Sequence, residues 1–343
     1  MKLIQLVTGA TWSSRSRDAF NLAEAWRASG RSALMVIPRQ WVPQPFIAER
    51  GIPFHTINIG GFFDVFAPVQ LSKLICGEER CVIHAHTVAE AEVASKAVRL
   101  AAKEGAKARI VLTLHRLPDR LTPSVKAVLH SCAAIIVSGV EASGKLNAMD
   151  CDVMEKVHPL TPGTPLCHAA TPPLPHSLAP EKPITFLYHG AITKAKGTDK
   201  VIASFVASSS KPVQLIMAGE GPGRDVMPMI RLIRSEHLTD RVEWPGTVND
   251  LEQLIARCDV GICPGYSPCD FSLGAAECEA MGRTVITDGA NLYEAMAYAA
   301  EHSDELPGLG SEARSRAILR HSFTHYFERM VEIYRADESH RSC

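Results

Sequence analysis

The chain has 343 residues, of which 46% are hydrophobic and 21% are charged, and its formal net charge at pH 7 is −1. A length of this order predicts two domains. The nearly balanced charge argues against nucleic acid as the main partner. The apolar runs are too short to cross a bilayer, and no basic amphipathic helix is distinct enough to indicate membrane attachment.

The first ten residues, MKLIQLVTGA, lack the apolar core and small-residue cleavage site of a signal peptide, and they are typical of a first strand. We therefore expect a cytoplasmic protein, with peripheral contact at the inner face of the membrane left open. The ten cysteines include no C-x-x-C pair. In a chain of this length without a secretion signal, we expect them to be reduced and mostly packed as small apolar residues.

The first half of the chain alternates short apolar runs with helix-forming segments. A helix over residues 18–29 places Phe20, Ala23 and Trp26 along one side and ends at Gly30. Strands are predicted at residues 3–7, 33–37, 52–59, 82–84, 110–114 and 134–137. Repeated βα units of this kind predict an α/β fold with a doubly wound parallel sheet.

A proline-rich segment separates this half from the next. Seven prolines lie within residues 162–183, so we assign residues 1–165 to a first Rossmann-like domain and residues 166–183 to a semi-rigid linker. Strands predicted at residues 184–188, 213–218, 242–244, 260–263 and 284–287 then form a second Rossmann-like domain over residues 184–320. Residues 322–335 carry apolar side chains at the spacing of an amphipathic helix, within a final segment over residues 321–343.

The segment over residues 259–288 carries the strongest functional signal. It predicts a strand, a loop rich in proline and glycine, a helix beginning near Ser272, and a second strand. Such a loop lies outside the carboxyl ends of the strands, where open α/β sheets bind ligands, and the amino end of the helix favours phosphate. Glu277 is about five residues into the helix, which suits a carboxylate that grips a ribose while the helix end holds a diphosphate.

Residues 271–288, FSLGAAECEAMGRTVITD, resemble the nucleotide-sugar-binding segment of the GT-B glycosyltransferases, in particular the retaining GT4-like group (glycosyl transferases group 1). The usual pattern of that group is E-x-F-G-L-x-x-x-E-A-x-A-x-G-x-P-V-I. The segment aligns with it without a gap, anchored at Glu277, Ala280 and Gly282. The first glutamate of the pattern is Cys269 here, with Asp270 beside it.

This resemblance implies a role for each matching residue. It implies that Glu277 holds the ribose, that Cys269 or Asp270 contacts hydroxyls of the donor sugar, and that backbone N–H groups near Ser272 and Leu273 bind phosphate. It also implies two Rossmann-like domains that face each other across a cleft, with the final helix packed back on the first domain.

Three other segments of the second half fit the same family. Residues 186–197, FLYHGAITKAKG, resemble the G-R-x-x-x-x-K-G segment, with Gly190 and Lys196 in place and Ala191 where the family has arginine. In the family the arginine and lysine neutralise the departing diphosphate. Lys196 is expected to do so here, with Lys194 as a possible helper, and an exposed lysine at a helix start is the alternative. The turn at Gly221 resembles the G-x-G-P segment, and the backbone near Thr247 and Val248 is expected to meet the nucleobase.

The first half contains two histidine segments, VIHAHTVAEAEVA (82–94) and IVLTLHRLP (110–118), which resemble V-H-x-H and V-x-T-x-H of the family. We expect these histidines near the carboxyl ends of strands. In the family the T-x-H histidine lies near the donor sugar, so His115 is the candidate for the catalytic region. A zinc site built on His84 and His86 is an alternative that lacks a third ligand of recognisable spacing, and a core role for His84 is another.

The loop after the first strand, TGATWSSRSRD, has a second interpretation. TGAT after a first strand also begins short-chain dehydrogenases, but the two further glycines of a dinucleotide loop are missing and no Y-x-x-x-K occurs. We expect this loop, with Gly9, to line the site where the donor phosphate or the acceptor approaches.

The sequence thus predicts a retaining, metal-independent glycosyltransferase of the hexosyltransferase kind, which acts in polysaccharide biosynthesis and needs no cofactor. The donor would be a sugar linked to UDP, GDP or ADP, and the acceptor a hydroxyl of a glycan, a lipid-linked or a small molecule. His115, Lys196 and Asp270 are the expected catalytic residues. The alternative is a catalytically weakened GT-B protein that binds nucleotide or glycan as a partner subunit, because the family arginine and first glutamate are replaced by Ala191 and Cys269.

Overall fold

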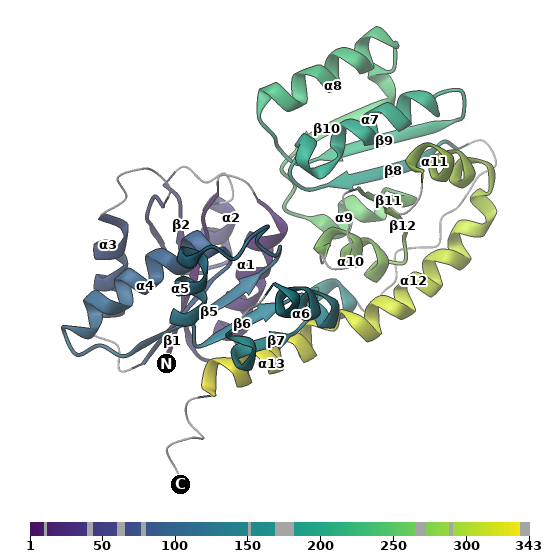
Figure 1. Ribbon diagram of the computed structural model, residues 1–343. Coiled ribbons are helices and arrows are strands. Elements are labelled where there is room, and N and C mark those ends of the chain that lie inside the picture. Colours follow the sequence, from purple (N-terminus) through teal and green to yellow (C-terminus); the bar gives the residue numbers. More distant parts are fainter. Residues whose placement is uncertain are drawn as a thin grey trace. The chain divides into compact units, whose positions relative to one another are not determined.

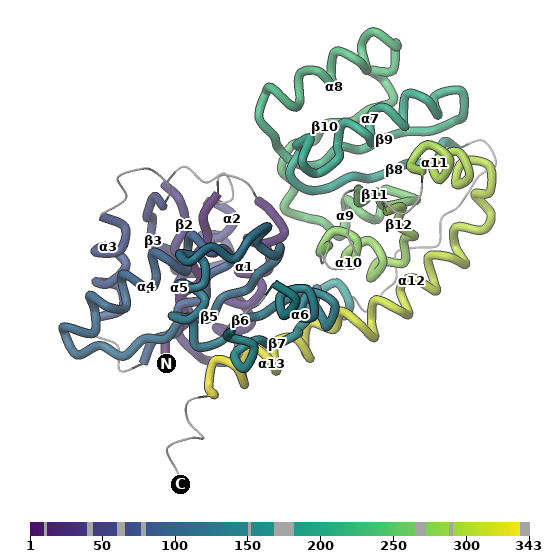
Figure 2. The backbone as a smooth tube through the Cα atoms, viewed as in Figure 1, coloured from purple at the N-terminus to yellow at the C-terminus, as the bar shows by residue number. Residues whose placement is uncertain are grey.

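The structure, a computed structural model, describes residues 1–9, 12–39, 44–59, 66–76, 80–149, 152–168, 182–264, 272–287 and 291–336 (Figures 1 and 2). The chain divides into two compact units. The first unit comprises Met1–Thr11, Arg15–Pro162 and His325–Cys343, and the second comprises Trp12–Ser14 and Gly163–Thr324. The predicted domain boundaries were drawn at a segment of which residues 169–181 lie outside the described ones.

The first unit is built on a seven-stranded parallel sheet in the order β3-β2-β1-β4-β5-β6-β7. Six strands were predicted from their apolar runs, and the short edge strand β7 was not. The strands are β1 (Lys2–Leu6), β2 (Ser32–Ile37), β3 (Phe54–Thr56), β4 (Cys81–Ala85), β5 (Ala108–Leu114), β6 (Ala134–Val137) and β7 (Val157–Pro159).

Helices cover both faces of this sheet (Figure 1). They are α1 (Ser14–Ala28), α2 (Gln44–Glu49), α3 (Phe66–Ile75), α4 (Val88–Ala102), α5 (Pro123–Ser131), α6 (Gly139–Ala148), the short η1 (Met154–Lys156) and the final α13 (Phe323–Arg335). Helix α4 begins where the Thr87 side chain accepts a hydrogen bond from the Glu90 N–H, which satisfies one of the donors exposed at a helix start. Its alanine-rich face packs into the largest core cluster of the unit.

The final helix α13 packs on the first unit, as predicted. Its buried stripe includes Tyr326, Met330 and Tyr334. Tyr334 meets the Trp26 ring of α1 edge to face, with the ring centroids 5.4 Å apart. A buried aromatic pair of this kind adds about 0.5–1.5 kcal/mol beyond the area that it buries. The end of the chain therefore completes the core of the unit formed by its beginning.

The second unit is built on a five-stranded parallel sheet in the order β10-β9-β8-β11-β12. All five strands were predicted: β8 (Ile184–His189), β9 (Val213–Ala218), β10 (Val242–Gly246), β11 (Val260–Cys263) and β12 (Thr284–Thr287). The helices are η2 (Pro165–His168), η3 (Lys194–Lys196), α7 (Thr198–Ala207), α8 (Gly223–Ser235), η4 (Thr239–Arg241), α9 (Leu251–Ala256), α10 (Leu273–Ala280), α11 (Leu292–Glu301), η5 (Ser303–Glu305) and α12 (Leu306–Arg320).

Each sheet has one point where the order of its strands reverses. In the first sheet the chain moves outward from β1 to β3 and then continues with β4 on the other side of β1. In the second it moves outward from β8 to β10 and then continues with β11 on the other side of β8. Ligands of open α/β sheets bind at the carboxyl ends of the strands at such points. The candidate sites therefore lie after β1 and β4 in the first unit, and after β8 and β11 in the second.

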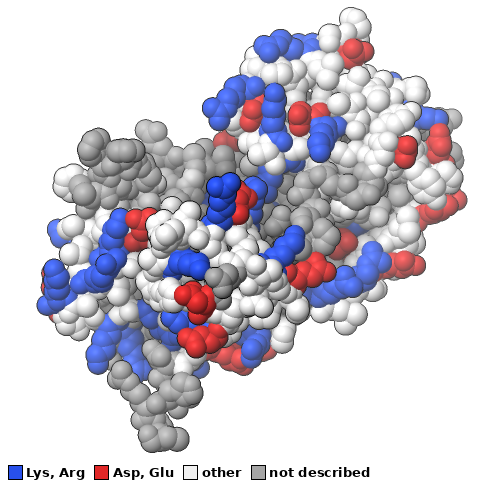
Figure 3. Space-filling model, in the orientation of Figure 1, with Lys and Arg blue, Asp and Glu red and all other residues white. Residues whose placement is uncertain are grey.

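The described residues show how the charges are distributed on the surface and in what state the cysteines are. On the face in Figure 3, Lys and Arg side chains alternate with Asp and Glu and form no large patch of one sign. Seven cysteines in the described ranges are not in disulfides: Cys76, Cys81, Cys132, Cys167, Cys258, Cys263 and Cys278. Within the described chain, every helix is too short or too polar to span a bilayer.

Candidate functional site

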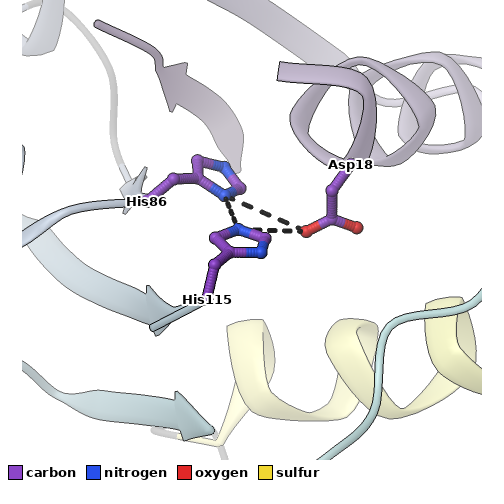
Figure 4. Close-up of side chains that lie close together, drawn as sticks. All are labelled: Asp18, His86 and His115. Carbon is purple, nitrogen blue, oxygen red and sulfur yellow. Dashed lines mark hydrogen bonds and ion pairs between the residues drawn. The ribbon is translucent and has the colours of Figure 1, made fainter. Parts of the chain in front are cut away.

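In the first unit, two histidines that follow neighbouring strands meet an aspartate from α1 (Figure 4). His86 follows β4 and His115 follows β5, and His86 Nδ1 lies 3.0 Å from His115 Nε2. Asp18 Oδ2 lies 3.9 Å from His86 Nδ1 and 3.7 Å from His115 Nε2. His115 therefore lies at the carboxyl end of its strand, as predicted, but it is joined there by a carboxylate that the sequence analysis did not select.

The hydrogen-bond partners define which nitrogen of His86 carries its proton. His86 Nε2 lies 2.8 Å from the amide oxygen of Gln5, so this nitrogen donates. Nδ1 is then the acceptor for the His115 Nε2–H. Burial lowers the pKa of His86 well below 6.5, which keeps the ring neutral. His115 is therefore oriented by a neutral, buried neighbour.

Glu90 forms hydrogen bonds with both the loop after β1 and the end of β4. Its carboxylate accepts hydrogen bonds from the backbone N–H of Thr8 at 2.6 Å and of His86 at 2.7 Å. Glu90 is 1% exposed, and this burial raises its pKa. Gly9, a predicted donor-binding residue, follows directly with φ of 111°, a conformation that favours glycine. Glu90 therefore holds the start of the predicted loop, at Thr8, close to His86.

Asp18 is held by the C-terminal helix. The Tyr326 hydroxyl donates to Asp18 Oδ2 at 3.1 Å, and both side chains are buried. Burial raises the pKa of Asp18 to about 7, an effect that the Tyr326 hydrogen bond partly offsets. A carboxyl group in this position exchanges its proton near neutral pH.

This raised pKa predicts a specific pH dependence of stability. The folded state keeps the Asp18 proton up to about pH 7, whereas the unfolded state releases it near pH 3.8. The contribution of Asp18 to stability is thus fully present below pH 3.8 and is lost as the pH rises to about 7. As the pH rises from 5 to 8, the unfolding free energy of the wild type is expected to fall by about 2–3 kcal/mol relative to that of Asp18→Asn, which has no carboxyl group at this position. Urea unfolding of both proteins at the two pH values measures this, and an equal pH dependence would contradict it.

His84 belongs to the core rather than to the site. Its Nε2 lies 2.7 Å from Thr113 Oγ1 and its Nδ1 lies 2.8 Å from the Tyr334 hydroxyl. Burial lowers its pKa to about 3. Both ring nitrogens are thus used inside the unit, which argues against the alternative of a His84 and His86 zinc pair and supports the core interpretation of His84.

The cluster of Asp18, His86 and His115 has the dimensions of a metal site nonetheless. Its three ligand-type atoms lie within 4.8 Å of one another. Zinc bound at about 2.0–2.1 Å holds tetrahedral ligand atoms about 3.3 Å apart, close to the 3.0, 3.7 and 3.9 Å found here. A cation would have to replace the proton that the two histidines share.

In the second unit, three glycines let the loops after β8 and β9 approach closely. Gly190 has φ of 142° and Gly219 has φ of 134°. A Cβ atom at Gly219 would overlap the carbonyl oxygen of Gly190, and one at Gly221 would overlap that of Ile192. The glycine turn that the sequence analysis singled out thus brings backbone against backbone at the carboxyl edge of the sheet.

Lys196 is the last residue of η3 and is separated from α7 by Gly197. It is exposed, as is Lys194, and Gly197 after it has φ of 70°. The Tyr188 hydroxyl donates to the Ala191 carbonyl at 2.6 Å and fixes the start of this loop. The lysine is therefore placed on the same edge as the glycine turn, with its ammonium group in contact with solvent.

Helix α10 carries Glu277 in its second turn. The helix begins at Leu273, and its N-cap Ser272 accepts a hydrogen bond from the Ala275 N–H at 3.2 Å. Glu277 is 3% exposed, and its Oε2 lies 3.7 Å from Nδ1 of His189 at the end of β8. The predicted helix start and the position of Glu277 in the helix are both confirmed.

Comparison with solved structures identifies the fold. Anabaena HepE in complex with UDP-glucose matches with a TM-score of 0.74 and 16% identity over 97% of this chain and 98% of that one. A glycosyltransferase from Rickettsia africae matches with a TM-score of 0.71 and 15% identity over 98% of each chain. The pneumococcal O-GlcNAc transferase GtfA, in complex with UDP and GlcNAc, matches with a TM-score of 0.70 and 9% identity over 98% of this chain and 99% of that one. The fold is therefore GT-B.

Residues 174–299 match the family model of the glycosyl transferases group 1. The protein is a glycosyltransferase with the GT-B fold. No curated protein matches the chain. The matched range contains all the predicted donor-binding residues of the second half, from Gly190 to Glu277.

Two predicted site residues of this glycosyltransferase, Cys269 and Asp270, lie outside the described residues. Val248 lies in the loop between β10 and α9 and packs against the core cluster of α9. Asp18, Glu90 and His189 were not predicted as site residues from the sequence. His189 had a usable signal, because it directly precedes Gly190 at a strand end, as His86 and His115 directly follow strand ends.

Proposed function

We propose that this glycosyltransferase moves a sugar from a nucleoside-diphosphate sugar to a hydroxyl acceptor, a glycan, a lipid-linked or a small molecule, with retention of anomeric configuration. One observation carries the proposal. The amino end of α10 and the carboxylate of Glu277 lie beside the end of β8, at the point where the strand order of the second sheet reverses. An amino end of a helix attracts phosphate, and an adjacent carboxylate accepts hydrogen bonds from ribose hydroxyls.

The proposed roles are those that the family resemblance implies for each residue. The backbone N–H groups near Ser272 and Leu273, together with Lys196, bind the diphosphate, and Gly190 and Gly221 leave room for it. The backbone at Val248 meets the base, and Cys269 or Asp270 contacts the sugar. His115 acts near the sugar, and the loop with Gly9 lines the site where the donor phosphate or the acceptor approaches. The leaving diphosphate itself helps to deprotonate the acceptor, so that no protein nucleophile is needed.

A thermal shift screen tests the proposed donor. A ligand that binds only the folded state raises the melting temperature by mass action. UDP, GDP and ADP are each added at the same concentration to wild type and to Glu277→Gln. We expect one of them to raise the melting temperature of the wild type clearly more than that of the variant. Equal shifts in both proteins would contradict the ribose role of Glu277.

A chelator tests metal independence. Wild type dialysed against EDTA is expected to keep its full rate of transfer, because Lys196 and the end of α10 supply the positive charge that a divalent ion supplies elsewhere. Zinc added back should then leave the rate unchanged or lower it, by occupying Asp18, His86 and His115. A loss of activity on chelation that zinc, magnesium or manganese restores would contradict the proposal.

The second candidate is a weakened GT-B protein that binds nucleotide or glycan without efficient turnover. It is favoured by Ala191, which stands in the place of the family arginine and whose carbonyl is held by the Tyr188 hydroxyl. Losing one such charge costs about 10²-fold or more in rate. Tight nucleotide binding without turnover over a broad acceptor panel would support this candidate. We favour the enzyme because Glu277, Lys196 and His115 are all present.

A further inference from the structure

The His189 side chain lies against one face of α10. Its Nε2 lies 3.2 Å from the Gly274 carbonyl oxygen and 3.7 Å from Cys278 Sγ, and its Nδ1 lies 3.7 Å from Glu277 Oε2. Residues 274, 277 and 278 are spaced i, i+3 and i+4, so they form one side of the first two turns. The last residue of β8 thus contacts the helix at each of these positions.

Gly274 allows the ring to approach this closely. A Cβ atom at Gly274 would lie 3.3 Å from His189 Cε1 and 3.4 Å from its Nε2, which is tighter than ordinary van der Waals contact. His189 itself is 8% exposed. The imidazole is therefore packed in a fixed orientation between the strand and the helix.

The contacts also define the chemistry of the ring. A carbonyl oxygen only accepts, so His189 Nε2 carries a hydrogen and donates to Gly274. The other nitrogen, Nδ1, faces a carboxylate, which also only accepts when ionised. A hydrogen between Nδ1 and the Glu277 carboxyl group resolves this arrangement and pairs the two side chains. Hydrogen bonding and pairing of this kind offset the cost of burying a carboxyl group.

We propose that His189 is a positioning residue for Glu277: it holds the carboxylate in the orientation that grips the ribose and fixes the first turns of α10 at the diphosphate. The inference rests on the proposed function, because it assigns the partner of the ribose-binding group. It adds a residue that the matching sequence patterns do not contain. Both contacts lie within the second unit.

Two amide variants separate the two contacts of the ring. The side-chain nitrogen of asparagine takes the place of His189 Nδ1, and that of glutamine takes the place of Nε2. His189→Asn thus keeps a donor toward Glu277, whereas His189→Gln keeps only the donor toward the Gly274 carbonyl. His189→Leu removes both donors.

The experiment is isothermal titration of the full-length variants with UDP, GDP and ADP, using whichever binds the wild type most tightly. We expect His189→Gln and His189→Leu to lower the affinity about tenfold and His189→Asn to lower it about threefold or less. In a Glu277→Gln background, His189→Leu should have no further effect, because the group that it positions is gone. The reverse order of the amide variants, or an undiminished effect of His189→Leu in that background, would overturn the inference.

A second measurement tests the interaction between His189 and Glu277 in the absence of nucleotide. Chemical unfolding of wild type, His189→Leu, Glu277→Gln and the double variant should show that the two substitutions are not additive. Additive effects would overturn the pairing. If Glu277→Gln lowers nucleotide affinity while every His189 variant binds like the wild type, the inference is wrong and the proposed function stands. If Glu277→Gln binds like the wild type, the ribose site is wrong, and the positioning role of His189 fails with it.

Discussion

Replacing His115 with alanine is expected to lower the rate of sugar transfer by about 10²–10³-fold and to leave the affinity for the nucleoside diphosphate nearly unchanged. His115 belongs to the first unit, whereas the residues proposed to bind the nucleotide belong to the second. Its ring is oriented through His86 and Gln5, so its imidazole is fixed before a donor arrives. Loss of a preorganised group acts on the transition state more than on ground-state binding.

The matched control is His130→Ala. His130 is an exposed histidine of α5 that pairs with Asp152 on the surface, so its removal should leave the rate within about twofold. Initial rates at saturating donor and titration with UDP, GDP or ADP are measured for both variants. A His115→Ala protein with the wild-type rate, or with a loss of nucleotide affinity equal to the loss of rate, would contradict the assignment.

Lys196→Ala is expected to lower the rate of transfer about 10²-fold and to weaken nucleoside diphosphate binding as well. The diphosphate is charged both in the donor and as the leaving group, and more charge develops on it in the transition state. Because Ala191 stands in place of the family arginine, the lysine carries a larger share of the neutralisation. Lys194→Ala, two residues earlier on the same exposed turn, should give a smaller loss if it assists.

Lys200→Ala serves as the control for this prediction. Lys200 is exposed in the first turn of α7, four residues after Lys196. Its removal changes the net charge by the same amount and should affect the rate less than twofold. Salt-dependent losses of similar size in Lys196→Ala and Lys200→Ala would indicate a general electrostatic effect and would remove the specific role of Lys196.

Most of the fold followed from local sequence. The strands β8, β9, β11 and β12 are short apolar runs bounded by glycine, proline or polar residues, as expected of strands buried in a parallel sheet. Strand β7 was missed because Val157–Pro159 is a three-residue edge strand that is only partly buried. The helix α13 was predicted from its period, and its packing on the first unit was predicted from the family resemblance alone.

The candidate sites were harder to predict because they join residues that are far apart in sequence. Tyr326 reaches Asp18 across 308 positions and Tyr334 reaches His84 across 250. A local sequence pattern cannot predict contacts between residues so far apart in the chain. Strand-end histidines could be located from periodicity, but which of them is a core residue depended on its neighbours. The ring of His84 meets Thr113 and Tyr334, whereas that of His86 meets Gln5 and His115.

Consumption of a nucleotide-linked sugar by the purified protein tests the central claim most directly. Release of nucleoside diphosphate is measured with UDP-, GDP- and ADP-glucose and a panel of hydroxyl acceptors, for wild type and for Glu277→Gln. The account predicts acceptor-dependent release by the wild type with one of these donors, and release at least about 10²-fold slower by the variant. Equal rates in the two proteins, or a wild type that binds none of the three nucleotides, would contradict it.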